Sequence, residues 1–422
     1  SKKARALVST IWMISQTMSS AAVLYATSLV LAFILGIDVV SAIFIVTFIA
    51  LIYTMLGGIT AVIWTDVIQS AILFIGAGII MYALITEMPT SFADTLVKLK
   101  DAGKLDPLNF SFDFTQVTTV WSGVIAMTIY HITVYGTNQM MVQRTLAAKN
   151  IGDAKKSYLL MGFVAFFIYL FFVVMGVLFY SYYDGKPFEN SNLIILTFAN
   201  DYGVPGLMGI IAAAVMAASM SSLDSALNSL STISTLDVYK KYYAKDKTDK
   251  HYLKATRIFT LLWALIIIVP AIMYHLHAVG SILEILTKVG SFFVGAQLAM
   301  FALGFFSKHT TEKGLLIGTA ISFGVVTYVA LFTDLAWPWY AAVGVFVSIF
   351  ASISVSILLD GFQENYSKYT IKGQLKDFIE NDKPQKENGW YLVPGKVDSI
   401  NYLLMLFFVL SLGSLVLFEY LV

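Results

Sequence analysis

The chain has 422 residues, of which 58% are hydrophobic and only 13% are charged. A soluble globular domain usually carries about 25% charged residues, so this composition indicates a protein that lies largely within a lipid bilayer. The formal net charge of +1 gives no case for nucleic-acid binding, and the absence of cysteine excludes disulfides and thiolate metal sites.

Apolar stretches long enough to cross about 30 Å of hydrocarbon recur along the whole chain. We expect an all-α membrane protein with eleven transmembrane helices, approximately at residues 6–35, 39–56, 61–85, 117–142, 157–180, 206–238, 255–275, 281–306, 314–332, 337–359 and 399–420. The first stretch continues into a full span, unlike a cleavable signal. The sequence does not begin with methionine, so we expect further residues upstream of Ser1.

Lysine and arginine are concentrated in alternate loops. One set of loops holds three cations in residues 2–5, four in 144–156, seven in 240–257, two in 308–313 and six in 360–398. The other set holds only Lys98, Lys100, Lys104 and Lys186. The positive-inside rule therefore places Ser1 in the cytoplasm and, after eleven crossings of a cell (inner) membrane, Val422 in the extracellular or periplasmic space.

Two extramembrane segments are long enough to fold. Residues 87–116 are expected outside, with a short helix in FADTLVKLKDAG, residues 92–103. Residues 360–398 are expected inside, with an amphipathic helix in QLKDFIEN, residues 374–381. We interpret both segments as connectors.

The sixth span carries an unusual number of oxygen-bearing side chains. Ala218, Ser221, Ser222 and Ser225 recur at i, i+3, i+4 and i+7 and share one helical face, with Asp224 beside it. Such oxygens, without histidine or cysteine, favour a hard cation such as sodium. The alternative is that these small residues permit tight helix packing, with each hydroxyl bonded to a carbonyl one turn back. The carboxylate of Asp224 favours ion binding.

Asp66 is the second acid expected within the membrane. Gly57-Gly58 is predicted to end one span at the inner face, which leaves Asp66 less than two turns into the next span. Asp66 either takes part in cation binding or complements the positive end of its helix, and the sequence leaves both interpretations open.

The fourth span is interrupted by Gly136-Thr137-Asn138-Gln139, a pattern typical of a discontinuous helix that lines a binding site. His131, Thr133 and Tyr135 precede this break and are candidates to face a substrate. The alternative for His131 is a hydrogen-bonded packing residue.

Lys288 lies in the eighth span, four residues after Glu284. This spacing predicts an ion pair on one helical face. The sharper hypothesis is that Lys288 attracts an anionic substrate.

Three stretches together resemble the sodium:solute symporter family, which includes sodium-coupled carriers of sugars, sialic acid, proline, iodide and monocarboxylates. They are YTMLGGITAVIWTDVIQ (53–69), VYGTNQMMVQRTLAAKN (134–150) and SSLDSALNSLSTISTLDVYKKY (221–242). The resemblance covers essentially the whole chain. It implies the inverted five-plus-five repeat fold of the leucine transporter.

In that fold, residues 1–86 would form core helices three to five and residues 117–306 would form core helices six to ten, with residues 87–116 as the extracellular loop between them. Residues 307–422 would form three peripheral helices and include a cytoplasmic segment at 360–398. The first two core helices are absent from the sequence. Because the first core helix supplies carbonyls to the common sodium site in this family, a polypeptide that begins at Ser1 is expected not to transport.

The resemblance also implies site residues. It assigns Ala218, Ser221 and Ser222 to the common sodium site and Asp66, Asp224 and Ser225 to a possible second sodium site. The substrate candidates are His131, Thr133, Val134, Tyr135 and Lys288, because the family's sugar-contact residues do not carry over. His131 stands where sugar carriers have an amide, and Val134 where they have a gating tyrosine. A simple sugar is therefore disfavoured, and an acidic substrate would need Lys288.

We therefore expect a sodium-coupled secondary active symporter for a small organic anion such as sialic acid or a monocarboxylate, with one or two Na+ per cycle. The alternatives are a sodium/sugar or amino-acid symporter of the same family and, from a different class, an ion channel. The five scattered histidines give no indication of an enzyme. The expected partners are the solute, sodium ions and the lipid bilayer.

Overall fold

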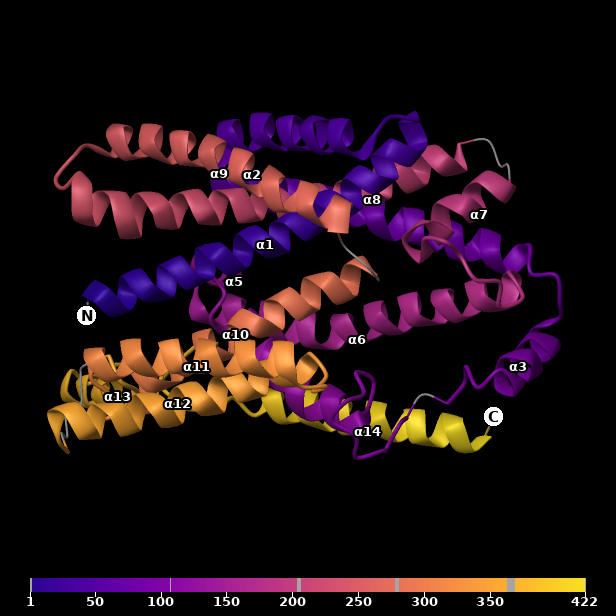
Figure 1. The fold of residues 1–422 in the computed structure, drawn as a ribbon. Coiled ribbons are helices and arrows are strands. Elements are labelled where there is room, and N and C mark those ends of the chain that lie inside the picture. Colours follow the sequence, from indigo (N-terminus) through magenta and orange to yellow (C-terminus); the bar gives the residue numbers. More distant parts are fainter. Residues whose placement is uncertain (1, 107, 203–205, 278–280, 363–368, 422) are drawn as a thin grey trace. The chain divides into compact units, whose positions relative to one another are not determined.

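The computed structural model of the chain describes residues 2–106, 108–202, 206–277, 281–362 and 369–421, without the side chains at 53, 56–62 and 419–421. It is almost entirely helical (Figure 1). In chain order the elements are α1 (Lys2–Leu35), α2 (Val39–Thr86), α3 (Phe92–Asp101), the π-helix η1 (Ser122–Ala126), α4 (Met127–Gly136), α5 (Gln139–Leu146), α6 (Ile151–Tyr182), the 3-10 turn η2 (Ser191–Leu193), α7 (Ile194–Tyr202), α8 (Leu207–Ile233), the π-helix η3 (Ser234–Tyr243), α9 (Asp249–His277), α10 (Ile282–Phe306), α11 (Glu312–Phe332), α12 (Pro338–Asp360), α13 (Ile371–Glu380), β1 (Lys386–Glu387), β2 (Trp390–Tyr391) and α14 (Ile400–Leu421).

Within the described residues, nine helical stretches are long and apolar enough to cross a membrane. They are Lys2–Leu35, Ile63–Thr86, Ile151–Tyr182, Leu207–Tyr243, Asp249–His277, Ile282–Phe306, Glu312–Phe332, Pro338–Asp360 and Ile400–Phe418. The two remaining spans of the eleven expected are a shorter apolar stretch, Val39–Ile52, and the interrupted run through η1, α4 and α5.

Gly57-Gly58, expected to separate two spans, lies outside the residues that the structure describes in full. The helical stretches on either side, Val39–Ile52 and Ile63–Thr86, correspond to the two expected spans.

Both predicted connector helices are confirmed. α3 begins after Ser91, whose hydroxyl accepts a hydrogen bond from the backbone N–H of Asp94 at 3.2 Å. α13 covers residues 371–380 and begins after Thr370, which caps the N–H of Gly373 in the same way. Such caps satisfy backbone donors that a helix start leaves without an intrahelical partner.

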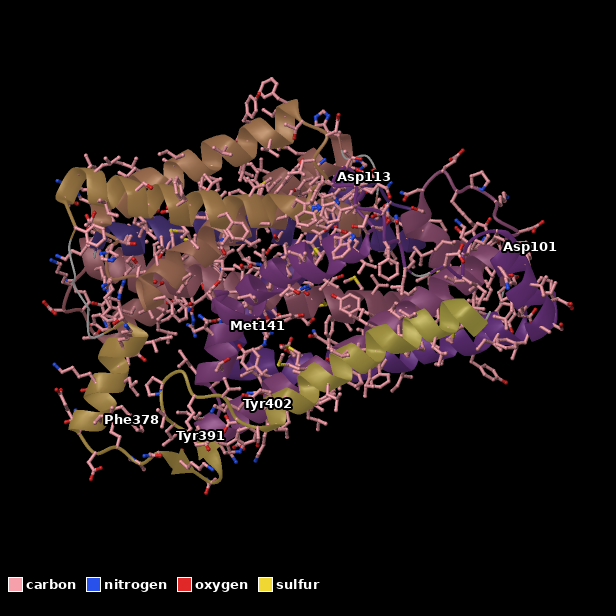
Figure 2. The ribbon with its side chains drawn as sticks, turned by 90° about the horizontal axis from the view of Figure 1, so that it is seen from below. Asp101, Asp113, Met141, Phe378, Tyr391 and Tyr402 are labelled. Carbon is pink, nitrogen blue, oxygen red and sulfur yellow. The ribbon has the colours of Figure 1, made fainter. Side chains whose placement is uncertain are left out.

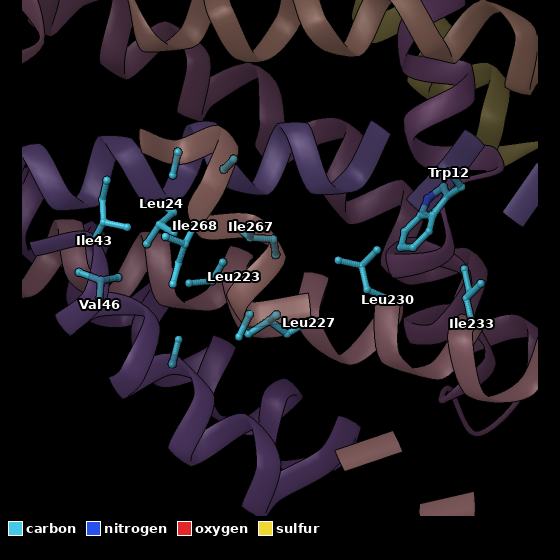
Figure 3. Close-up of a cluster of buried hydrophobic side chains, with 14 residues drawn as sticks. Trp12, Leu24, Ile43, Val46, Leu223, Leu227, Leu230, Ile233, Ile267 and Ile268 are labelled. Atoms are coloured by element: carbon cyan, nitrogen blue, oxygen red, sulfur yellow. The ribbon is translucent and has the colours of Figure 1, made fainter. Parts of the chain in front are cut away.

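The chain forms two compact units, the first comprising residues 1–86, 138–140 and 187–293 and the second comprising residues 87–137, 141–186 and 294–422. The core of the first unit is an apolar cluster contributed by α1, α2, α8 and α9 (Figure 3). Its members recur every three or four residues along each helix, for example Leu223, Leu227 and Leu230 on α8 and Ile43, Val46 and Ala50 on α2. This periodicity lines one face of each helix, and the packing of these faces fixes α8 against its neighbours.

Small residues bring α2 and α8 into close contact in the first unit. A Cβ placed at Gly76 of α2 would lie 2.8 Å from the Cβ of Ala214 and 3.5 Å from Cγ2 of Ile210, both on α8. Gly78, two residues later, has no such neighbour within 4 Å. Gly76 therefore sets the distance between the two helices.

We predict that Gly76→Ala pushes α2 and α8 apart and lowers the free energy of unfolding by about 1–3 kcal/mol, as overpacking usually does. Gly78→Ala is the matched control, because it adds the same methyl group to the same helix without a clash. The measurement is the thermal unfolding midpoint of the purified protein. Equal midpoints for the two variants would show that the contact at Gly76 does not constrain the packing.

The second unit has its own close helix pair, α11 and α12, which lie side by side (Figure 1). A Cβ at Gly318 would lie within 2.5 Å of Ser352, and the hydroxyl of Ser322 donates to the carbonyl of Gly344 at 2.8 Å. Glycine and serine at these positions permit the backbones to approach and supply hydrogen bonds where lipid offers none.

A polar contact in the second unit fixes the C-terminal segment to the start of α6. The Nζ of Lys155 on α6 donates to a carboxylate oxygen of Asp398 and to the carbonyl of Tyr391, while the other carboxylate oxygen of Asp398 accepts from the N–H of Tyr391 at 2.9 Å. Figure 2 shows α13 and the β1–β2 hairpin leading to the start of α14, with Phe378, Tyr391 and Tyr402 marked along this path. C-terminal to these contact residues, α14 packs on α6, and the side chain of Leu404 occupies the space beside Gly162.

Burial of the Asp398 carboxyl raises its pKa, but hydrogen bonds from Lys155 and Tyr391 and the charges of Lys155 and Lys386 outweigh this effect, and the pKa lies below its ordinary value of 3.8. A group whose pKa is lower in the folded state stabilises that state above its ordinary pKa, and this stabilisation is lost as the pH falls through the folded-state pKa. The contact is therefore intact at neutral pH and weakens only in strong acid.

We predict that Asp398→Asn releases the segment at neutral pH and raises amide hydrogen exchange in residues 386–398 about tenfold, because the variant removes a charge-assisted hydrogen bond. Asp382→Asn is the control, since Asp382 is an exposed carboxylate of the same segment. Unchanged exchange in Asp398→Asn would contradict this role for the contact.

Candidate functional site

α8 carries the candidate sodium ligands and belongs wholly to the first unit. The helix begins after Gly206, whose φ of +88° is a conformation that other residues rarely adopt. Its leucines face the apolar cluster, and its small and polar residues occupy the turns between them. The helix continues without interruption into the π-helix η3.

Ser221 and Ser222 are half-buried, and their hydroxyls donate to the same acceptor. The distances to the carbonyl oxygen of Ala218 are 2.8 Å from Ser221 and 3.3 Å from Ser222. This is the back-bonding that the packing interpretation predicts. It is equally the arrangement a cation requires, because a hydroxyl whose proton points at a carbonyl presents its lone pairs elsewhere.

Asp224 and Ser225 are more deeply buried, with exposed fractions of 0% and 2%. One carboxylate oxygen of Asp224 accepts from the backbone N–H of Ser225 at 2.6 Å and lies 3.4 Å from its hydroxyl. A carboxylate removed from both water and lipid headgroups is costly unless a positive charge or several donors compensate it. Packing alone does not explain an acid at this position.

Asp66 lies on α2 and is half-buried. α2 packs directly against α8 in the first unit, so the structure brings together the two helices that carry the sodium-site candidates. Gln69 follows Asp66 by three residues and shares its helical face. Its side-chain oxygen is buried, with no hydrogen-bond partner among the described residues. Gln69 is not among the site residues predicted from the sequence, although its spacing from Asp66 in TDVIQ could have indicated it.

The predicted break in the fourth span is confirmed. α4 ends at Gly136, Thr137 leaves the helical conformation with φ of −128° and ψ of −11°, and α5 begins at Gln139. The side chain of Asn138 accepts from the N–H of Met140 at 2.9 Å, which caps the new helix. The carbonyl of Tyr135 accepts a hydrogen bond from the hydroxyl of Tyr158 at 3.0 Å.

The substrate candidates on α4 lie in the second unit and are largely occupied by local contacts. The ring nitrogen Nδ1 of His131 lies 2.8 Å from the carbonyl of Met127, and the ring stacks on Tyr135 at a centroid distance of 5.7 Å. Since a carbonyl only accepts, Nδ1 carries the proton. Thr133 is 1% exposed, and its hydroxyl lies 3.2 Å from the carbonyls of both Ile129 and Val294. Val134 and Tyr135 remain half-buried.

Lys288 lies in the part of α10 that belongs to the first unit. Its side chain is exposed, as is that of Glu284. The ion pair predicted between them is wrong: neither residue forms an ion pair within the described part of the chain. Exposed pairs of this spacing are worth only a few tenths of a kcal/mol, about 0.3–0.5, so spacing alone does not enforce them.

No group of three or more His, Cys, Asp or Glu side chains that could hold a metal occurs among the described residues. The candidate residues on α8 and α2 offer hydroxyl, carbonyl and carboxylate oxygens. Such a ligand set suits a hard monovalent cation.

Residues 1–322 match the Sodium:solute symporter family. The chain is 28% identical over 330 residues to the sodium/sialic acid symporter NanT of Aliivibrio fischeri, which covers 77% of this chain and 65% of that protein. It is 29% identical over 388 residues to the sodium/glucose cotransporter of Vibrio parahaemolyticus, and the match covers 84% of this chain and 70% of that protein. It is 27% identical over 337 residues to sodium-coupled monocarboxylate transporter 1 of Homo sapiens, and the match covers 77% of this chain and 54% of that protein.

The fold is similar to that of a Na+-coupled sialic acid symporter solved in a substrate-bound, outward-open state. The TM-score is 0.77 at 24% sequence identity, over 86% of this chain and 76% of that one. The likeness confirms a helical membrane protein of the leucine-transporter-like fold. The chain is shorter than its relatives and spans between 54% and 70% of their lengths. Because the family match extends over residues 1–322 of 422, the chain belongs to the sodium:solute symporter family, which comprises transporters and not enzymes.

Proposed function

We propose that the protein is a sodium-coupled secondary active symporter that imports a small organic anion. Family membership supports the coupling to sodium. Two of the relatives reported above are named for sialic acid and monocarboxylates, which are organic anions, and one is named for glucose. The burial of Asp224 is the observation that carries the proposal, because a carboxylate at this depth in a membrane protein is typical of an ion-binding or functional site.

The common sodium site is proposed at Ala218, Ser221 and Ser222. The carbonyl of Ala218 attracts two hydroxyl protons, which turns the hydroxyl lone pairs away from the helix axis. Sodium needs five or six oxygens, and α8 supplies only part of that set. In this family, carbonyls of the first core helix supply further ligands to this site.

A second sodium ion is proposed at Asp66, Asp224 and Ser225. Successive crossings alternate in direction, so the second half of α2 and α8 run antiparallel. Gly76 contacts Ala214, and ten residues along each helix from this contact, about 15 Å, lie Asp66 and Asp224. The two carboxylates are thereby expected at one level of the membrane. This supports a cation between the helices, with Gln69 as a further oxygen donor.

We assign the Ser1 end to the cytoplasm and the C-terminus to the outside of the cell membrane, because the cations are concentrated in the loops on the Ser1 side. In this orientation α8 runs inward from Leu207, and Ser222 lies on the cytoplasmic half of the helix. Residues 1–86 then belong to the first repeat and residues 117–306 to the second. Sodium would stabilise the outward-open state and leave toward the cytoplasm after the helices rock.

For the substrate site we propose the helix break at Gly136–Gln139 and the residues before it, His131, Thr133, Val134 and Tyr135. The local contacts of His131 and Thr133 leave little hydrogen-bonding capacity for a neutral hexose. Lys288, in the first unit, is exposed and forms no ion pair among the described residues, and we propose it separately as a cation that attracts an anionic substrate.

The decisive experiment is uptake of radiolabelled sialic acid and of short monocarboxylates by cells that express the protein, with sodium or choline as the external cation. We expect saturable uptake that is lost when choline replaces sodium. Uptake that is unchanged in choline would end the symport proposal. Flux that does not saturate with substrate would favour a channel.

We predict that Ser222→Ala and Asp66→Ala each raise the sodium concentration needed for half-maximal uptake about tenfold, the effect of losing roughly 1.4 kcal/mol of ion binding. Ser231→Ala is the matched control. Its hydroxyl is also buried and also donates to a carbonyl of the same helix, that of Asn228, but it lies outside the site. An equal shift in Ser231→Ala would show that the first two variants act on helix packing alone.

A further inference from the structure

One end of the first unit carries a dense group of positive charges, which we call the basic surface. It comprises the ten lysine and arginine side chains in residues 2–5 and 240–257, and all ten are exposed. These cations come from the start of α1, the π-helix η3, the start of α9 and the short loop between η3 and α9.

Contacts within the first unit hold the three helical elements together. Arg5 of α1 pairs with Asp237 of η3 at 3.5 Å, and the hydroxyl of Tyr242 donates to the carbonyl of Lys2 at 3.0 Å. α9 joins η3 through the hydroxyls of Thr256 and Thr235, 3.0 Å apart. Segments that are distant in sequence thus form one surface.

The charge of the basic surface is poorly compensated. The same ranges include two acids, Asp246 and Asp249, and the neighbouring Asp237 is already paired with Arg5. Lys240 lies over the ring of Tyr252 at 4.6 Å. The cations other than Arg5 are all exposed, and none of them forms an ion pair among the described residues.

The basic surface lies at the boundary between charged and apolar sequence on all three elements. On α1 the apolar run follows Arg5, and on α9 it follows Arg257. Exposed apolar and aromatic side chains stand among the cations, with exposed fractions of 45% for Leu236, 44% for Tyr242, 78% for Tyr243 and 56% for Leu253. Tyrosines beside cations at such a boundary are typical of the headgroup layer of a membrane.

We propose that the basic surface binds the headgroups of anionic phospholipids in the cytoplasmic leaflet. This inference rests on the orientation proposed above. The uncompensated charge is complementary to phosphate, and the exposed tyrosines and leucines provide a surface for the adjoining acyl chains. The apolar component distinguishes a lipid from free phosphate as the occupant.

The test is native mass spectrometry of the intact protein in detergent with an equimolar mixture of phosphatidylglycerol and phosphatidylcholine of identical acyl chains. We expect the wild type to retain phosphatidylglycerol in preference. A variant with Lys241, Lys245, Lys250 and Lys254 changed to Gln is expected to reduce this preference at least about tenfold, since each basic residue near an anionic surface contributes measurably to the attraction.

The matched control changes Lys372, Lys376, Lys383 and Lys386 to Gln, which removes the same charge from a segment where acids and lysines alternate. An equal loss in this control, no preference in the wild type, or loss of the preference in millimolar inorganic phosphate would each overturn the proposal. Lipid retention is measured without sodium or transport, so its outcome is separate from that of the symport proposal. A thermal unfolding midpoint within the wild-type range confirms that the quadruple variant is folded.

Discussion

The burial of one carboxylate, that of Asp224, is the constraint on which the interpretation of this molecule depends. Asp224 directly follows Leu223, a member of the apolar cluster, and its side chain is fully buried. Hydrocarbon and packed leucines do not solvate a negative charge. The backbone N–H of Ser225 donates a hydrogen bond to the carboxylate. A cation at the proposed site between α2 and α8 would add to this compensation and would tie the packing of these helices to ion occupancy.

Close packing makes this coupling effective. Because Gly76 and Ala214 bring α2 and α8 into contact, a change in the charge between the helices cannot be absorbed by a loose interface. The apolar cluster of α1, α2, α8 and α9 joins the same helices over several turns. An ion at the proposed site between α2 and α8 would act on a rigid group of helices, as alternating access requires.

Sequence patterns were sufficient to predict the elements that local composition alone determines. The apolar lengths indicated the nine long helices, Ser91 and the residues after it indicated α3, and Gly136 through Gln139 indicated the break between α4 and α5. They failed where the outcome depends on tertiary context. The π-helices η1 and η3 have no simple sequence signal, and Lys155 and Asp398 are 243 residues apart. The i, i+4 spacing of Glu284 and Lys288 indicated a pair that exposure to solvent makes too weak to form.

The hydroxyl geometry on α8 is compatible with packing and with the proposed sodium site. Ser221 and Ser222 donate their protons to the carbonyl of Ala218, and their hydroxyl lone pairs point elsewhere. The carbonyl of Ala218 already accepts both hydroxyls, so it would become a sodium ligand only when a hydroxyl turns away. Sodium at the proposed site would therefore rearrange these hydrogen bonds, and the free energy of binding would be available to favour one conformation over another. Coupled transport requires this differential affinity between conformations, and tight binding alone does not provide it.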